Sequence, residues 1–86
     1  MPEDLMDTYC RRICAILRKR LNASVFVNPS PYIEDAIEVK IKRWDLQYKQ
    51  IIPDMPYIVQ HGESSTLIAD RIIANYKASI IKEIFG

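Results

Sequence analysis

The spacing of hydrophobic residues changes along the chain, and the first segment has the period of a helix. When residues 2–21 are placed at about 100° intervals, apolar side chains cover one half of the cylinder and most basic ones cover the other. The apolar half consists of Leu5, Met6, Tyr9, Cys10, Ile13, Cys14, Ile16, Leu17 and Leu21. Pro2 suits a first helical turn, where its missing N–H would be unpaired anyway. The pattern therefore predicts an N-terminal helix over residues 2–21.

The middle of the chain alternates with a period of two, which is typical of strands. In "AIEVKIKR", Ile37, Val39 and Ile41 share one face, and the opposite face is charged. Segment 23–27 is β-branched and ends at the turn signal Asn28-Pro29, and segment 46–52 alternates less regularly. "YIVQ" at 57–60 is either a fourth short strand or an extended connection. The connections are too short for crossover helices, so the sheet is predicted to be antiparallel.

The last segment returns to a helical period and carries two apolar stripes. Ser64 or Ser65 is suited to cap its first turn, and we expect the helix to end at Phe85. The larger stripe contains Ala69, Ile72, Ile73, Tyr76, Ile80 and Ile84, and the second contains Leu67, Ala74, Ala78, Ile81 and Phe85. One stripe can face the sheet, so the second needs its own cover, either the first helix or another protomer. Ala74 and Ala78 would allow a second helix to approach closely at this stripe.

Together these elements predict a single α+β domain over residues 1–86, with two layers and the order α-β-β-β-α. The antiparallel sheet has three strands, or four if "YIVQ" pairs, and both helices are expected on one sheet face. No apolar run is long enough to span a bilayer, and the acidic start "MPEDLMD" differs from a signal peptide. We therefore expect a cytoplasmic protein without a membrane partner. Isoleucine outnumbers leucine, which is consistent with an AT-rich genome such as that of a low-GC bacterium, its phage or a mobile element.

Few residues are candidates for catalysis or metal binding, and the sequence contains no catalytic or cofactor-binding motif. Cys10 and Cys14 are four apart, which is neither a redox pair nor a zinc set, and we expect reduced, packed thiols. His61 in "QHGESS" is expected in a solvated loop at a helix cap rather than in a catalytic site. A zinc site would require Cys10, Cys14, His61 and a carboxylate to converge. The sequence thus predicts no enzymatic activity, cofactor, metal or small-molecule substrate.

The charge distribution raises the possibility of nucleic-acid binding. The net charge is only +1, but residues 11–49 hold nine of the twelve basic and four of the eleven acidic residues, a net charge of +5. The candidates for contact with phosphate groups are Arg11, Arg12, Arg18, Lys19, Lys40, Lys42 and Arg43. Phe26, Trp44 or Tyr48 could stack on bases. The alternative is that these basic residues face water and balance the helix dipole.

The surplus of apolar surface favours a non-enzymatic protein-interaction module. Its expected partner is a second copy of the chain in a homodimer, and the alternative partner is another protein. The predicted interface comprises Leu67, Ala74, Ala78, Ile81 and Phe85 of the second stripe, together with Trp44. The alternative function is a nucleic-acid-binding module that uses the basic segment 11–49.

Overall fold

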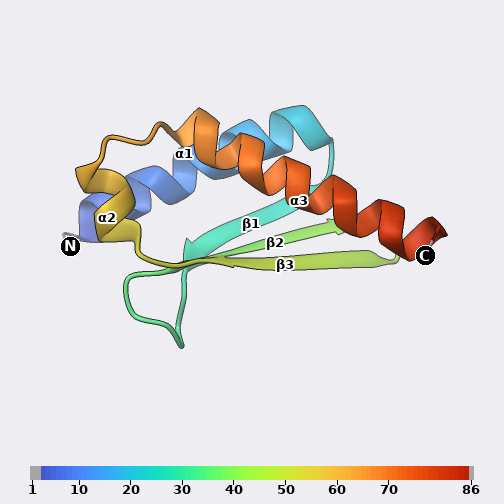
Figure 1. The fold of residues 1–86 in the computed structure, drawn as a ribbon, viewed down its shortest axis with the longest axis horizontal. Coiled ribbons are helices and arrows are strands. Elements are labelled where there is room, and N and C mark those ends of the chain that lie inside the picture. The colour runs from blue at the N-terminus through green and yellow to red at the C-terminus, as the bar shows by residue number, and fades with distance from the viewer. Residues whose placement is uncertain (1–2, 86) are drawn as a thin grey trace.

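A computed structural model describes residues 3–85, which form a three-stranded sheet with helices packed against it (Figure 1). In chain order the elements are α1 (Glu3–Leu21), β1 (Ser24–Pro29), β2 (Ile37–Arg43), β3 (Leu46–Ile52), α2 (Met55–Gln60) and α3 (Ser65–Phe85). The predicted α+β order, an N-terminal helix followed by antiparallel strands and a C-terminal helix, is confirmed. Pro2, which was expected in the first helical turn, lies outside the described residues.

The sheet is an antiparallel meander with β2 in the centre. Across the three strands, Phe26 is opposite Lys40, and Lys40 is opposite Lys49. Because side chains alternate between faces, this row lies on the face opposite to Val39 and Ile41, which are fully buried. The alternation predicted for β2 therefore assigns the two faces of the whole sheet correctly.

Helices α1 and α3 lie on the same side of the sheet in Figure 1. α1 packs on β1 and on α3, and α3 also contacts β3. The core between these layers contains Cys10, Ile13, Leu17, Leu21, Val25, Val27, Ile37, Val39, Ile41, Met55, Ile68, Ala69, Ile72, Ile73 and Tyr76. Ser64 caps α3, since its Oγ accepts a hydrogen bond from the Leu67 N–H at 3.1 Å. The predicted cap is thus found, and so is the larger stripe of α3 except for Ile84, whose side chain lies outside the described residues.

The segment "YIVQ" belongs to the short helix α2, so its prediction as a strand or an extended connection was wrong. Asp54 precedes α2 with a φ of 58°, and Pro56 lies in the first turn, where a missing N–H has no consequence. Met55 anchors the helix, because its side chain is fully buried in the core. Its backbone N–H donates to the Asp35 carbonyl at 2.9 Å. A segment of six residues is too short for its hydrophobic spacing to separate a strand from a short helix.

The connection between β1 and β2 projects from the sheet on the side away from the helices (Figure 1). Ser30 organises its start, because the Ser30 Oγ accepts hydrogen bonds from the N–H groups of Tyr32 and Ile33 at 3.3 and 3.1 Å. The Ser30 N–H donates to the Ala36 carbonyl at 2.8 Å, which closes the loop at its base. The loop therefore forms a wall beside the outer face of the sheet.

Candidate interaction surfaces

The second stripe of α3 is exposed to solvent in the single chain. Leu67 is 44% exposed and Ile81 is 57% exposed, and Ala74 and Ala78 between them are also exposed. These four residues are called the α3 stripe below. At about 100° per residue they fall within an arc of about 60°, on the side of the helix opposite to the buried Ile72 and Tyr76. The side chain of Phe85, the fifth predicted member, lies outside the described residues.

Helix α1 does not cover the α3 stripe. It meets α3 along the neighbouring flank, where the Arg20 guanidinium forms an ion pair with the Asp70 carboxylate. The alternative in which the first helix covers the stripe is therefore wrong for the described chain. A close helix–helix contact at Ala74 and Ala78 remains a prediction for contact with a second molecule.

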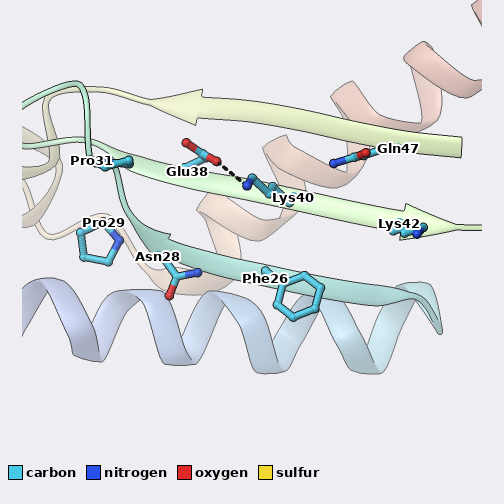
Figure 2. Close-up of a pocket in the computed structure, with 8 residues that line it drawn as sticks. All are labelled: Phe26, Asn28, Pro29, Pro31, Glu38, Lys40, Lys42 and Gln47. Carbon is cyan, nitrogen blue, oxygen red and sulfur yellow. Dashed lines mark ion pairs between the residues drawn. The ribbon is translucent and has the colours of Figure 1, made fainter.

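The outer face of the sheet carries a groove of about 540 Å³ (Figure 2). We call it the sheet groove; it is lined by Phe26, Asn28, Pro29, Pro31, Glu38, Lys40, Lys42 and Gln47. Phe26 projects from β1 on this outer face and is 53% exposed, so its ring is accessible from solvent. Pro31 comes from the β1–β2 loop, so the wall formed by that loop closes one end of the groove.

Glu38 is the only acidic residue among the outward-facing positions of the three strands, all of which the structure describes. It is only 8% exposed, and two lysines neutralise it. The Lys40 Nζ lies 3.2 Å from one carboxylate oxygen and the Lys49 Nζ lies 3.8 Å from the other. Both lysine side chains are still about half exposed, so they also face solvent. With Lys42 included, this face has three lysines against one glutamate, an excess of two positive charges.

Trp44 occupies the tip of the β2–β3 hairpin and is 75% exposed. The turn has only two residues, Trp44 and Asp45, between the paired residues Arg43 and Leu46. The φ of Trp44 is 56°, a region that two-residue hairpins usually fill with glycine or asparagine. The Arg43 guanidinium lies 4.5 Å from the Trp44 ring centroid, within the range of a cation–π contact. A bulky side chain held at positive φ in solvent is a backbone outlier that points to a function.

A second hollow of about 410 Å³ lies beside the hairpin tip. It is lined by Arg18, Asn22, Ala23, Ser24, Lys42, Arg43 and Trp44. Arg18 closes the edge of the sheet here, because its Nε and Nη2 donate to the Val25 carbonyl at 3.1 and 3.0 Å. Lys42 lines both this hollow and the sheet groove, so the two hollows adjoin at this residue.

The structure divides the predicted nucleic-acid contacts into two groups. One group contains Lys40, Lys42 and Arg43 of β2, together with Arg18 of α1, which lines the hollow at the hairpin tip. The other group contains Arg11, Arg12 and Lys19, which are exposed elsewhere on α1. The fold therefore does not gather all seven into one patch. The regular alternation of β2 already indicates the outward position of Lys40 and Lys42, but the pairing of Glu38 with Lys49 required the register of β3.

Tyr48, suggested as a stacking residue, faces the interior, and that suggestion was wrong. Its ring makes an edge contact with Tyr76 at a centroid distance of 5.6 Å. Its hydroxyl donates to the Gln50 Oε1 at 2.8 Å, and burial raises the pKa of Tyr48. Alternation explains this position, because Tyr48 is opposite the buried Ile41. Phe26 and Trp44 are the two suggested stacking residues that remain on the surface.

The histidine and the cysteines do not come together. The His61 ring stacks on Tyr57 at a centroid distance of 3.9 Å, and the Glu63 carboxylate pairs with Arg71 at 2.9 Å. Cys10 is buried, and burial, helped by the nearby Asp7 and Cys14, raises the pKa of its thiol to about 11. Among the described residues no group of three or more His, Cys, Asp or Glu side chains is placed to hold a metal ion.

Taken together, the geometry defines a small two-layer α+β domain with two exposed surfaces, the α3 stripe and the outer sheet face. No protein-family model matches the chain, and no curated protein or solved structure matches it at a significant level. Within residues 3–85, none of the helices combines the length and apolar character needed to cross a bilayer. The two exposed surfaces are therefore the features from which a function can be inferred.

Proposed function

We propose that this domain is a non-enzymatic protein-interaction module that forms a homodimer through the α3 stripe. The observation that carries the proposal is the exposure of Leu67 and Ile81 on the face of α3 that points away from the core. Leucine and isoleucine at helical spacing, with alanines between them, match the pattern of a helix–helix contact. Covering them with a second copy removes apolar surface from water.

The stripe is self-complementary when two copies of α3 run antiparallel. With the two-fold axis at Ala74, Leu67 of one protomer lies at the level of the partner's Ile81. Asp70 and Lys77 share one flank of the stripe, so Asp70 comes within about one residue rise of the partner's Lys77. The small alanines then occupy the centre, where the two helix axes are closest, and the larger side chains fill both ends.

The size of the stripe indicates a dimer of moderate affinity. From Leu67 to Ile81 the contact runs along about 21 Å of helix. An interface of this length belongs to the small end of specific protein–protein interfaces. We therefore expect dissociation in the micromolar range, so that monomer and dimer are both observed at accessible concentrations.

Ala78→Glu tests the proposal by sedimentation equilibrium over a range of protein concentrations. The parent chain should show a monomer–dimer equilibrium, and the variant should remain a monomer, because association would desolvate a carboxylate beside the partner's Asp70. Since Ala78 is exposed in the protomer, the melting temperature of the monomeric variant should not fall through damage to the core.

Ala15→Glu is the matched control, because Ala15 is an exposed alanine on α1 and lies outside the stripe. This variant should dimerise like the parent chain. A parent chain that stays monomeric at high micromolar concentration would contradict the proposal. So would an Ala78→Glu variant that dimerises as tightly as the parent.

A further inference from the structure

We infer that the outer sheet face binds single-stranded nucleic acid, with Phe26 and Trp44 as stacking platforms. This inference is independent of the proposed dimer, because the α3 stripe faces away from the sheet. It rests on three features of the described residues: two exposed aromatic rings, an excess of basic side chains, and two hollows that adjoin at Lys42.

The aromatic rings lie at two separate positions on this surface, midway along β1 and at the tip of the β2–β3 hairpin. Phe26 is 53% exposed in the sheet groove, and Trp44 is 75% exposed at the hairpin tip. Every base has a flat face that can stack on such a ring, and each stack contributes about 1–3 kcal/mol by alanine substitution. In a duplex these faces are occupied by neighbouring bases, so the geometry selects unpaired strands.

Basic side chains lie between and beside the rings. Lys40 and Lys49 lie in the same cross-strand row as Phe26. Lys42 lines both hollows, and Arg43 already lies over the Trp44 ring, where a phosphate group could also reach it. Because Glu38 is neutralised by Lys40 and Lys49, the face retains a positive excess. That excess complements a polyanion.

The sheet groove also contains polar side chains that can form hydrogen bonds with the edges of bases. The Asn28 and Gln47 side chains line the sheet groove on either side of the lysines (Figure 2). Amide groups both donate and accept hydrogen bonds, so they can contact any base without strong selection. The expected ligand is therefore a short unpaired stretch of RNA or DNA, bound with little sequence preference.

The test measures fluorescence anisotropy of a labelled, unstructured oligonucleotide of about ten nucleotides, long enough for a typical single-strand site. If about three phosphates are neutralised, affinity should fall about 20-fold between 50 and 200 mM salt. Phe26→Ala should weaken binding by about 10-fold or more, as expected for one lost stack. Its matched control is Tyr57→Ala, which removes an exposed ring from α2 and should leave binding unchanged.

Two further variants examine the charges. Lys42→Gln should weaken binding and reduce the salt slope by about 0.7, whereas Lys19→Gln on α1 should change neither. Glu38→Gln should tighten binding, because it releases Lys40 and Lys49 from their ion pairs with the carboxylate. It should also steepen the dependence of log affinity on log salt concentration, by up to about 0.7 for each lysine released. Thermal melting of each variant shows whether a change in binding reflects unfolding.

Three outcomes would overturn the inference. No binding at 50 mM salt would remove it, as would equal affinity for a duplex of the same length, which would indicate only general attraction to polyanions. Tighter binding of a polyglutamate peptide than of the oligonucleotide would assign the groove to an acidic protein partner instead. Ala78→Glu changes the dimer interface and not the sheet groove. Sedimentation therefore tests dimerisation and anisotropy tests nucleic-acid binding, and either one can fail without the other.

Discussion

Replacing Trp44 by asparagine should stabilise the fold while it weakens binding to single strands. A non-glycine residue in the left-handed region costs roughly 1–2 kcal/mol, and the Trp44 φ of 56° lies in that region. Asparagine adopts such a φ more readily because its short side chain bonds locally to the backbone. The substitution also removes the exposed cation–π contact with Arg43, which contributes about 0.5–1 kcal/mol.

From the midpoints of these two ranges, the difference is a net stabilisation of about 0.75 kcal/mol. For a domain of this size that corresponds to a rise in melting temperature of about 2–8 °C, which scanning calorimetry resolves. Over the same samples, anisotropy should show weaker binding of the labelled oligonucleotide, because one stacking platform is lost.

Trp44→Phe is the matched control for this experiment. It retains an aromatic ring and the same unfavourable φ, so its melting temperature should stay close to that of the parent chain and much of the binding should remain. A Trp44→Asn variant that melts below the parent would refute the strain argument. One that binds the oligonucleotide as tightly as the parent would remove Trp44 from the binding surface.

Two predictions concern the core. Met55→Ala should lower the free energy of unfolding in urea by about 2–5 kcal/mol, because the Met55 side chain is fully buried where α2 joins the core. Tyr57→Ala, on the exposed side of α2, is the control. If Met55→Ala lowers the free energy of unfolding by less than about 1 kcal/mol, α2 is not docked on the core. The pKa of Cys10 rises from 9.0 to about 11, so between these pH values the folded state keeps a proton that the unfolded state releases. Stability should therefore fall as pH rises through this interval, by up to about 3 kcal/mol, and a Cys10→Ala variant that shows the same decline would assign it to other groups.

The parts of the fold that follow from local pattern could be predicted from the sequence. Ile37, Val39 and Ile41 alternate with charged residues, so their burial follows once helices cover one sheet face. Ser64 is recognisable as a cap because a hydroxyl there precedes a helical apolar run. In each case the signal and the structure it specifies lie within a few residues of each other.

The rest depends on contacts between distant segments. Met55 reaches the core only because β3 returns the chain beneath the helical layer, and neighbouring residues carry no signal for that path. The two-residue turn at Trp44 depends on the register of β2 with β3, which places an aromatic residue where glycine or asparagine would be expected. The sequence places Glu38 on the charged face of β2, but only the register of β2 with β3 shows that Lys49 reaches its carboxylate.

The α3 stripe and the sheet groove lie on opposite sides of the protomer, and this arrangement determines how dimerisation would affect nucleic-acid binding. The α3 stripe points away from the sheet, and the sheet groove opens on the far side of the sheet from both long helices. A dimer joined through α3 would therefore leave both grooves uncovered and facing away from the interface. Each protomer would bind a short strand independently, whereas a strand long enough to reach both grooves would gain from the high effective concentration of the second site. The net charge of the chain is only +1, which limits the affinity of a single groove for nucleic acid. Simultaneous binding of one strand by both grooves of the dimer would therefore raise the affinity of a nearly neutral chain for a polyanion.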